Sequence, residues 1–472
     1  MLKQFDIVVL GGGPGGYVAA IRAAQLGRTV AVIERDKLGG TCLHRGCTPS
    51  KAMLRSAEVY HSIRHSAEYG IETEGSRLRL ELVHARKNTI IEQLHKGVQF
   101  LMKKNRIEVL HGHGRIVSVP GKEGSPGVIA VAAAGEESDI AFDNLIIATG
   151  SRPRSLPGLA IDGKYVITSE EALEMDALPA SVVILGGGAI GVEWASMLND
   201  FGVEVTIVEF EGRLLPLEDA DVSKELQRLF AKRGIKVLTG AKLLPESLKT
   251  GPHGIYVQAE QAAGLKELSA DKLLVAVGRE ANVAGFGLEQ TGVHIERGVI
   301  AVDGAMRTAE PNIYAIGDVI GGLQLAHAAS HEGLCAVEAI AGTHPEPIDL
   351  TLVPRCIYGR PEIASVGVTE QQAVERGHEV KTGKFSFKGI GKSLVYGASD
   401  GFVKVVADAR DNAILGVHMI GPHVTDYIGE ASLAQLLGAT TLQVGKMIHP
   451  HPTLSEIIGE AMLAVDRAAI HM

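Results

Sequence analysis

Two cysteines separated by four residues are the first candidates for chemistry. Cys42 and Cys47 lie in the segment Gly-Gly-Thr-Cys-Leu-His-Arg-Gly-Cys-Thr-Pro-Ser-Lys, residues 39–51. In a regular helix, residues five apart rise about 7.5 Å and point about 140° apart, which exceeds the usual disulfide span. The chain between the cysteines must therefore be irregular, and Gly46 makes that easy. Pro49 suits the first turn of a following helix, so Cys47 is expected near a helix N-terminus, where a thiolate is stabilised.

A redox-active pair is favoured over a metal site or a structural disulfide. No second cysteine pair follows at zinc-site spacing. The sequence has no run of about 18 apolar residues, and its opening lacks a signal-peptide cleavage pattern, so we expect a cytoplasmic protein without a membrane span. Structural disulfides are rare in that compartment. The other two cysteines, Cys335 and Cys356, are interpreted as small buried hydrophobic residues.

A second set of chemical groups lies near the carboxyl end, where residues 449–456 read His-Pro-His-Pro-Thr-Leu-Ser-Glu. Thiol–disulfide exchange needs a group that removes and returns protons near neutral pH, and histidine suits both tasks. Glu456 could orient such an imidazole. Alternatively, Thr453 and Glu456 have the spacing of a capping box at a helix start. One rotamer of Glu456 is not expected to serve both roles.

Composition limits the class of protein. A chain of 472 residues is expected to form about three domains of roughly 150 residues each. The 57 glycines and the 4% aromatic content are typical of an α/β protein that binds cofactors through its main chain. A net charge of −9 without a long basic run argues against nucleic acid as a partner.

An internal repeat supplies the elements that would serve such cofactors. Residues 6–34 recur without a gap at 181–209, and ten of the 29 paired positions are identical. Each copy reads as an apolar strand, a glycine loop, a helix and a second strand that ends in glutamate. This pattern is a βαβ unit with the Gly-x-Gly-x-x-Gly fingerprint of dinucleotide binding. Two copies on one chain indicate electron transfer between two dinucleotides.

Each residue of the fingerprint has a physical task. The first glycine permits a tight turn, the second lets the backbone approach a pyrophosphate, and the third lets helix pack on strand. The phosphates then meet free N–H groups at the helix N-terminus. Glu34 and Glu209 are each 18 residues past the last glycine, where an acid can accept from a ribose hydroxyl. The six glycines are Gly11, Gly13, Gly16, Gly186, Gly188 and Gly191.

Further strands are predicted to end in potential ligands. Buried strands are expected at 143–150, 273–279 and 312–318, the last with Asp318 at its carboxyl end. Ligands of open α/β sheets bind at those ends, so Asp318 is a candidate ribityl or ribose ligand. The alternative interpretation is an N-cap for the helix that follows. Beyond residue 346, short strands alternate with helices, which indicates a separate α+β domain.

Residues 39–51 resemble the redox segment of the flavin disulfide reductases, and the resemblance extends over essentially the whole chain. It implies that Cys42 exchanges with substrate and that Cys47 passes electrons to FAD. Lys51 would lie by the flavin and pair with Glu193. His44, Arg45 and Thr48 depart from the usual Asn, Val and Ile, which leaves the redox tuning open. At the carboxyl end the resemblance makes His451 the acid/base residue and Glu456 its partner, acting in the other subunit of a homodimer.

The resemblance also implies a fold and its cofactor contacts. We expect two Rossmann-like dinucleotide-binding domains and an α+β dimerisation domain: an FAD-binding and central part at 1–150 and 276–345, an NAD-binding domain at 151–275, and an interface domain at 346–472. FAD would be tightly bound, one per subunit. Beyond the fingerprint residues, Lys51, Glu193 and Asp318, the expected cofactor contacts are Gly114, Thr149, Gly150, Gly278, Arg279 and Ala326.

Among the members of this family, the dihydrolipoyl dehydrogenase branch fits best. Glu209 would repel a 2′-phosphate, which favours NAD, although the nearby Arg213 keeps NADP open. The carboxyl end lacks the cysteine pair of mercuric reductases. The implied partners are the lipoyl domain of a 2-oxoacid dehydrogenase E2 component or the glycine cleavage H protein. Another NAD(P)H-dependent disulfide reductase, a structural subunit of such a complex and a flavin-binding regulator are the alternatives.

Overall fold

The computed structural model describes residues 2–121 and 124–471 and forms two compact units. The first contains the residues up to Ala52, Glu81–Arg154 and Arg279–Ile348. The second contains Met53–Leu80, Ser155–Gly278 and the residues from Asp349 onward. The division into three domains stays a prediction.

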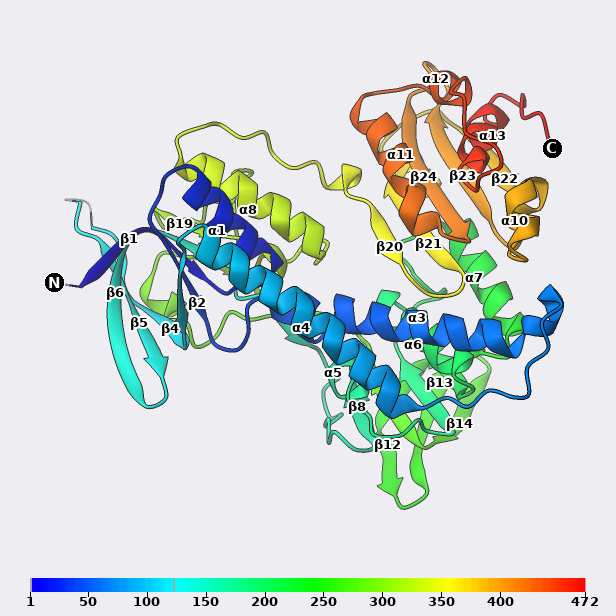
Figure 1. Cartoon of the computed structure of the whole chain (residues 1–472), viewed down its shortest axis with the longest axis horizontal. Coiled ribbons are helices and arrows are strands. Elements are labelled where there is room, and N and C mark those ends of the chain that lie inside the picture. Colours follow the sequence, from blue (N-terminus) through cyan, green and yellow to red (C-terminus); the bar gives the residue numbers. More distant parts are fainter. Residues whose placement is uncertain (1, 122–123, 472) are drawn as a thin grey trace. The chain divides into compact units, whose positions relative to one another are not determined.

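The first unit is built on a seven-stranded sheet (Figure 1). The strands follow one another across the sheet as β3 (Glu108–His111), β2 (Val30–Glu34), β1 (Lys3–Leu10), β6 (Glu136–Ile147), β5 (Gly127–Ala133) and β4 (His113–Ser118), and β19 (Ile313–Ala315) also pairs with β6. Strands β3, β2, β1, β6 and β19 are parallel, whereas β5 pairs antiparallel with both β6 and β4. Every residue of β2 is buried, as expected for a parallel strand covered on both faces.

Helices α1 (Pro14–Gln25) and α8 (Ala326–Ile340) lie side by side in this unit (Figure 1). Gly333 permits their close approach, because a Cβ there would lie 2.8 Å from the Gly15 carbonyl oxygen. The other elements of the unit are α2 (Gly40–His44), the start of α3 (Cys47–Arg64), α4 (Leu80–Lys104), β7 (Ser151–Pro153), β16 (Arg279–Ala281), β17 (Ile295–Glu296), β18 (Val299–Ile300), η2 (Leu288–Gln290) and η3 (Gly317–Ile320).

The second unit contains a parallel five-stranded sheet. Its order is β11 (Lys236–Leu238), β10 (Glu204–Val208), β9 (Ser181–Leu185), β15 (Lys272–Val275) and β8 (Val166–Thr168). Helix α6 (Ala189–Asp200) joins β9 to β10, so the predicted second βαβ unit is confirmed as a counterpart of β1–α1–β2. The remaining elements of this part are η1 (Ser66–Tyr69), α5 (Ser169–Ala172), α7 (Ala220–Lys232) and the antiparallel strands β12 (Lys242–Gly251), β13 (Gly254–Gln261) and β14 (Gly264–Ala270).

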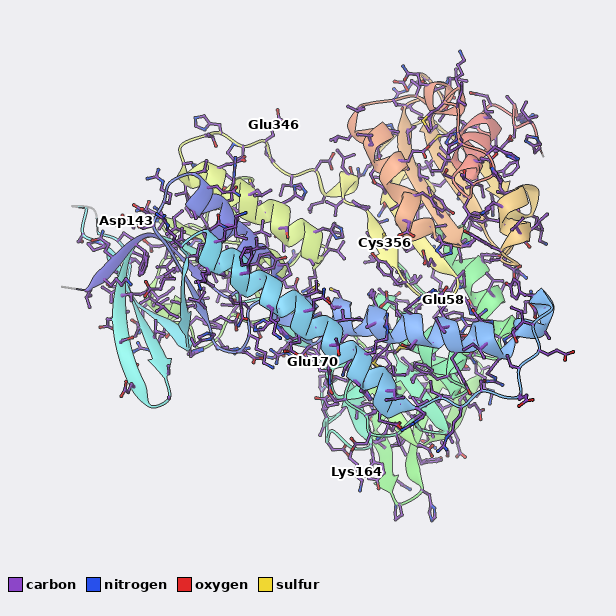
Figure 2. All side chains as sticks on the ribbon, viewed as in Figure 1. Glu58, Asp143, Lys164, Glu170, Glu346 and Cys356 are labelled. Atoms are coloured by element: carbon purple, nitrogen blue, oxygen red, sulfur yellow. The ribbon has the colours of Figure 1, made fainter. Side chains whose placement is uncertain are left out.

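The carboxyl-terminal part of the second unit is an antiparallel sheet with helices. Its strands are ordered β20 (Arg355–Ile357), β21 (Glu362–Gly367), β24 (Ile414–Gly421), β23 (Phe402–Asp408) and β22 (Val380–Ser386). Its helical elements are η4 (Leu350–Leu352), α9 (Glu370–Glu375), η5 (Phe387–Gly389), α10 (Gly391–Val395), α11 (Val424–Leu436), α12 (Thr441–Gly445) and α13 (Glu456–Ala464). The predicted α/β class with a carboxyl-terminal α+β part is confirmed. Cys356 lies on β20 and is partly exposed rather than fully buried (Figure 2).

Candidate functional site

The two cysteines lie at a break between helices. Cys42 is in α2, which ends at His44, and Cys47 is the first residue of α3. The predicted irregular connection and the position of Cys47 at a helix N-terminus are therefore confirmed. The side chains of Cys42 and Cys47 share a hydrogen bond. This bond is the main cause that raises the pKa of Cys42, followed by burial and the charge of Cys47, while Lys51 acts in the opposite direction. Cys42 thus keeps its proton near neutral pH.

The glycines of both fingerprints have the spatial roles that the motif requires. A Cβ on Gly11 would lie 2.2 Å from the Ala148 carbonyl oxygen, and one on Gly16 would lie 1.9 Å from the Gly11 carbonyl oxygen. In the second repeat, a Cβ on Gly186 would lie 2.3 Å from the Ala276 carbonyl oxygen, and one on Gly191 would lie 1.9 Å from the Gly186 carbonyl oxygen. In contrast, among the described residues, no atom beyond the local backbone and chain neighbours lies within 4 Å of the Cβ position of the middle glycines, Gly13 and Gly188. These two residues are the N-caps of α1 and α6 and have no side-chain cap, so the helix N-termini face open space. This arrangement fits a pyrophosphate on each loop.

The glutamate that ends each repeat supports its own glycine loop. Glu34 accepts from the Gly12 N–H at 2.8 Å and from the Asp36 N–H at 2.8 Å. Glu209 accepts from Gly187 and, at 2.7 Å, from Glu211. Each carboxylate oxygen has a second lone pair, so both acids retain capacity for ribose hydroxyls.

A polar cluster in the first unit joins residues that are distant in sequence. Asp318 accepts from the Ser151 hydroxyl and lies 3.8 Å from Arg279 Nε. Arg279 also donates to the Ser151 hydroxyl at 2.7 Å. The alternative interpretation of Asp318 as a helix N-cap is wrong, because Ile316 is the N-cap of η3 and Asp318 lies within that turn; Asp318 as a cofactor ligand stays a prediction. Ser151 was not recognised from the sequence, although it directly follows the Ala-Thr-Gly end of a predicted strand.

The other expected contacts lie at loop and strand ends. Thr149 donates from Oγ1 to the Asn282 carbonyl at 2.8 Å, and Gly150 has a φ of 70°. Ala326 is the first residue of α8. Gly114 lies on β4 against the carboxyl ends of β1 and β2, since a Cβ there would meet Leu10 at 2.6 Å and Ile33 at 3.2 Å. Gly278, with a φ of 103°, has open space where a side chain would be.

Glu193 and Lys51 belong to different compact units. Glu193 is buried on α6 and accepts from the Tyr358 N–H at 2.9 Å. Tyr358 is an additional residue that the sequence did not indicate. Lys51 lies on α3 one turn after Cys47. The predicted Lys51–Glu193 pair stays a prediction, because the two residues belong to different units.

At the carboxyl end, one rotamer of Glu456 serves both roles. Its Oε1 accepts from His451 Nδ1 at 2.8 Å, and its Oε2 accepts from the Thr453 N–H at 2.8 Å. The expectation that the two roles exclude each other is therefore wrong. The Thr453 hydroxyl contacts Pro450 and Ser455 instead, so only half of a capping box forms. Burial would raise the pKa of Glu456, but the Thr453 N–H and His451 together lower it, which keeps the carboxylate charged.

The segment is also anchored through its other histidine. The His449 side chain is only 7% exposed and its Nε2 lies 2.8 Å from the Glu430 carboxylate on α11. His451 is 79% exposed. The buried histidine therefore holds the segment to the domain, while the exposed one is available to a reactant. The anchoring pair was not predicted, because Glu430 is distant in sequence and carries no motif.

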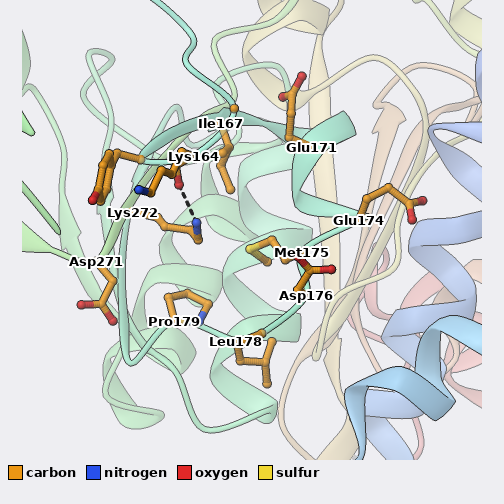
Figure 3. A pocket seen from close by; sticks show the side chains of 13 residues that line it. Lys164, Ile167, Glu171, Glu174, Met175, Asp176, Leu178, Pro179, Asp271 and Lys272 are labelled. Atoms are coloured by element: carbon orange, nitrogen blue, oxygen red, sulfur yellow. Dashed lines mark hydrogen bonds between the residues drawn. The ribbon is translucent and has the colours of Figure 1, made fainter. Parts of the chain in front are cut away.

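A cavity of about 470 Å³ lies in the second unit (Figure 3). Lys164, Pro179 and Lys272 line it, at the amino ends of β8, β9 and β15. Dinucleotides bind at the carboxyl ends of parallel strands, where Gly186 follows β9. This cavity is therefore not the cofactor site.

Comparison with known proteins gives the family. The model of the pyridine nucleotide-disulphide oxidoreductases matches residues 5–333, and that of their dimerisation domain matches residues 353–462. The chain belongs to the pyridine nucleotide-disulphide oxidoreductase family. It is 58% identical to the dihydrolipoyl dehydrogenase of Bacillus subtilis and 44% identical to that of Zymomonas mobilis, over all of each chain. Among solved structures, LpdA of Mycobacterium tuberculosis is similar with a TM-score of 0.89 and 29% identity, covering 98% of this chain and 99% of that one.

As a member of this family, the chain is an FAD-dependent oxidoreductase that uses a pyridine nucleotide, and its two open glycine loops fit both cofactors. The Arg213 guanidinium donates to the Pro216 carbonyl at 2.9 Å, so it is engaged within its own loop. This favours NAD over NADP. Within the described part of the chain, no His, Cys, Asp and Glu side chains group together in a way that could hold a metal ion. None of the described helices is long and apolar enough to cross a membrane.

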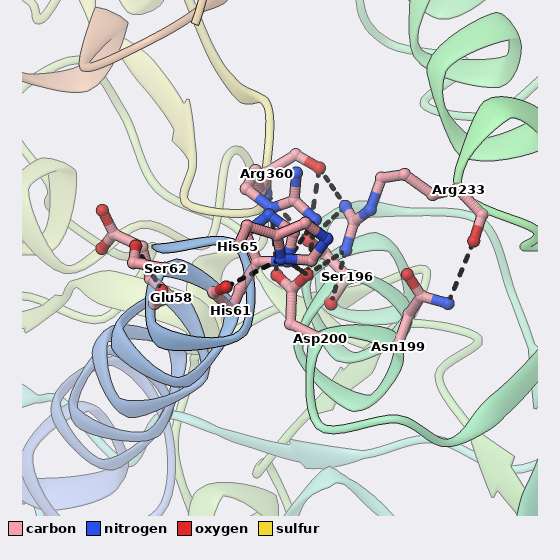
Figure 4. Close-up of polar contacts among 9 residues, drawn as sticks. All are labelled: Glu58, His61, Ser62, His65, Ser196, Asn199, Asp200, Arg233 and Arg360. Atoms are coloured by element: carbon pink, nitrogen blue, oxygen red, sulfur yellow. Dashed lines mark hydrogen bonds and ion pairs between the residues drawn. The ribbon is translucent and has the colours of Figure 1, made fainter. Parts of the chain in front are cut away.

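A buried ion cluster in the second unit of this oxidoreductase includes a titratable histidine (Figure 4). Asp200, at the end of α6, accepts from Arg233 at 2.9 Å and from Arg360 at 2.6 Å. Arg360 also donates to His61 Nδ1 at 3.4 Å. Burial and then the charge of Arg360 lower the pKa of His61 to about 4. The folded protein therefore keeps His61 neutral.

This shift predicts a contribution to acid sensitivity. Between the ordinary histidine pKa of about 6.5 and the folded value of about 4, the unfolded chain binds more protons, so stability falls as pH falls. His61→Asn keeps an acceptor for Arg360 without titrating. Between pH 7 and pH 4, we expect the free energy of unfolding of the wild type to fall by roughly 1–3 kcal/mol more than that of this variant. Urea denaturation at both pH values measures the difference. His253→Asn, at an exposed site, is the control, and parallel losses in wild type and His61→Asn would contradict the prediction.

Proposed function

We propose that the protein is a dihydrolipoyl dehydrogenase. It oxidises a protein-bound dihydrolipoyl group to the lipoyl disulfide and reduces NAD+ to NADH. The observation that carries this proposal is the thiol pair at the start of α3, with Cys42 hydrogen-bonded to Cys47, in a chain that also has two open dinucleotide loops. The full-length similarity to proteins named dihydrolipoyl dehydrogenase supports the choice of substrate.

The proposed reaction begins with the disulfide form of Cys42 and Cys47. His451 removes a proton from dihydrolipoamide, and the resulting thiolate attacks Cys42 Sγ, which breaks the Sγ–Sγ bond and leaves Cys47 as a thiolate. The second substrate thiol loses its proton and attacks the mixed disulfide. Lipoamide is then released with a closed ring, and Cys42 takes up a proton. The electron pair now resides on the two cysteines. FAD, when bound, supplies the transfer of this pair from Cys47 thiolate to NAD+.

Each remaining residue has a positioning role in this proposal. The open N-termini of α1 and α6, at Gly13 and Gly188, would hold the FAD and NAD pyrophosphates. Glu34 and Glu209 would bind the adenosine riboses, and Asp318 would bind the ribityl chain. Glu456 orients His451 and stabilises its charged form through Nδ1, so Nε2 faces the substrate. Lys51 would pair with Glu193 beside the flavin.

We further propose that the active form is a homodimer. The chain carries a dimerisation domain, and large apolar side chains are exposed on and near α11 and α12. They are Leu433, Leu436, Leu437, Leu442, Met447 and Ile448. Association would cover them and bring His451 of one subunit to the cysteines of the other. The proposed partners are the lipoyl domain of a 2-oxoacid dehydrogenase E2 component or the glycine cleavage H protein, and the proposed location is the cytoplasm.

Anaerobic titration of the purified yellow protein tests the proposal. Dihydrolipoamide is added first and NAD+ second, while the visible spectrum is recorded. We expect a long-wavelength charge-transfer band, due to Cys47 thiolate beside FAD, that decays as NADH forms. A spectrum that dihydrolipoamide leaves unchanged but NADH bleaches would overturn the lipoamide assignment and favour another NAD(P)H-dependent disulfide reductase. A protein that neither reductant changes would favour the regulator interpretation.

A further inference from the structure

Two histidines hold the turn that precedes Cys42. The Leu38 carbonyl oxygen lies 2.9 Å from His44 Nε2 and 3.0 Å from His95 Nδ1. A carbonyl only accepts, so His44 carries its hydrogen on Nε2 and His95 carries one on Nδ1. The two imidazole rings meet edge to face, with centroids 5.1 Å apart.

The turn at Leu38 connects the redox segment to the first dinucleotide loop. Gly39 donates its N–H to the Gly12 carbonyl at 2.8 Å. Gly39 and Gly40 have φ values of 103° and 57°, which non-glycine residues rarely adopt. A Cβ on Gly40 would lie 2.7 Å from Gly13 Cα. The backbone before Cys42 is thus closely packed and conformationally restricted, and α2 begins directly after it.

His44 lies on the same short helix as Cys42, whereas His95 lies on α4. The helix that carries Cys42 is therefore tied through His44 to the turn at its own start, and this turn is tied through His95 to a long helix of the same unit. Burial lowers the pKa of His44, and the charges of His95 and Lys37 lower it further, while the Leu38 carbonyl and Asp36 raise it. The Arg45 guanidinium adds a second tie to the Asp36 carboxylate at 2.8 Å.

We propose that His44 and His95 are positioning residues that stabilise the disulfide form of the Cys42–Cys47 pair. This inference rests on the proposed function, in which the two cysteines form a redox couple. Reduction of the disulfide by two electrons and two protons breaks the Sγ–Sγ bond and yields two thiols. The dithiol tolerates motion of α2, but the disulfide requires both sulfurs within bonding geometry. Hydrogen bonds that restrict α2 therefore favour the oxidised form and make the reduction potential of the cysteine pair more negative.

The test replaces each donor and measures the dithiol–disulfide equilibrium of the holoenzyme. His44→Leu and His95→Leu remove the donors. We expect each variant to shift the dithiol–disulfide equilibrium constant roughly three- to tenfold toward the dithiol, or about 15–30 mV for a two-electron couple. The protein is equilibrated anaerobically in buffers of reduced and oxidised dithiothreitol and quenched with an alkylating agent. Mass spectrometry then counts free Cys42 and Cys47, and this readout depends neither on turnover nor on the flavin.

Conservative variants separate positioning from general destabilisation. Glutamine places its amide nitrogen near the position of histidine Nε2, and asparagine places it near Nδ1. His44→Gln and His95→Asn should therefore restore most of the wild-type equilibrium. Lys96→Leu is the matched control, because Lys96 follows His95 on α4 and forms an exposed ion pair with Glu92.

The outcomes are distinguishable. A wild-type protein without a reversible Cys42–Cys47 couple would overturn the proposed function. A normal couple that neither leucine variant shifts would overturn the role of the histidines alone. A shift that the amide variants fail to reverse, or that Lys96→Leu also produces, would show that the effect is structural.

Discussion

Replacement of Cys42 by serine is expected to lower NAD+ reduction by dihydrolipoamide about 1,000-fold or more. The serine hydroxyl cannot form a disulfide, so the substrate thiolate has no sulfur to attack. Cys47 and both dinucleotide loops remain intact, because Cys42 lies on α2 and contributes to neither loop. NADH should therefore still bleach the flavin at close to the wild-type rate. Steady-state turnover and stopped-flow reduction by NADH measure the two effects separately.

Two further variants sharpen this prediction. Cys47→Ser should also abolish turnover, but it should in addition remove the long-wavelength band, which Cys42→Ser should keep. Cys335→Ser is the control, since the Cys335 thiol is buried on α8 and its contact is the Gly304 carbonyl at 3.6 Å. Turnover that survives in Cys42→Ser, or disappears equally in Cys335→Ser, would contradict the assignment of Cys42.

The redox segment and the dinucleotide loops were predictable because local rules govern them. Positive φ at Gly11 and Gly186, and the absence of room for a Cβ at Gly16 and Gly191, follow from the fingerprint alone. The break between Cys42 and Cys47 followed from the geometric conflict between a helix and a disulfide. In these segments each residue is constrained by neighbours within one turn or one βαβ unit, so spacing carries the information.

Tertiary contacts were not predictable in the same way. Ser151 meets Asp318 and Arg279 although 167 and 128 residues separate them in the chain. The sequence also indicated nothing about Lys404, which is 5% exposed in the middle of the buried strand β23. The ion pairs of Lys404 with Asp219 at 3.0 Å and Glu370 at 2.7 Å explain its burial, because a buried charge needs partners. Tertiary contacts, and not sequence spacing, determine which residues become such partners.

Glu456 shows why a local rule can be incomplete. A carboxylate has two oxygens, and the backbone turn at Thr453 directs one toward the Thr453 N–H and the other toward His451. The sequence rule treated the acid as a single acceptor and made the two roles exclusive. The structure shows that the cap fixes the rotamer that orients the imidazole, so the structural role supports the chemical one.

Substitution of His451 by glutamine is expected to lower kcat/KM for dihydrolipoamide roughly 100- to 10,000-fold at neutral pH, because a general base of this kind contributes about that much. Glutamine has a similar size but cannot carry the proton, and its amide nitrogen, near the position of Nε2, does not reproduce the Nδ1 contact with Glu456. Flavin reduction by NADH, which needs no substrate thiolate, should be unchanged. His471→Gln is the matched control. His471 is 70% exposed and its Nδ1 lies 2.8 Å from Glu460, which reproduces the histidine–carboxylate contact elsewhere in the second unit.

The pH dependence separates a base from a structural residue. If His451 removes the proton, raising the pH supplies substrate thiolate from solution, so the defect of His451→Gln should shrink toward the thiol pKa of dihydrolipoamide. Glu456→Gln should have a smaller effect, about tenfold, because it keeps an acceptor for the Thr453 N–H and loses only the charge that stabilises the imidazolium. A defect of His451→Gln that is independent of pH would contradict the base assignment. An equal defect in His471→Gln would show that any loss of a surface histidine–carboxylate pair suffices.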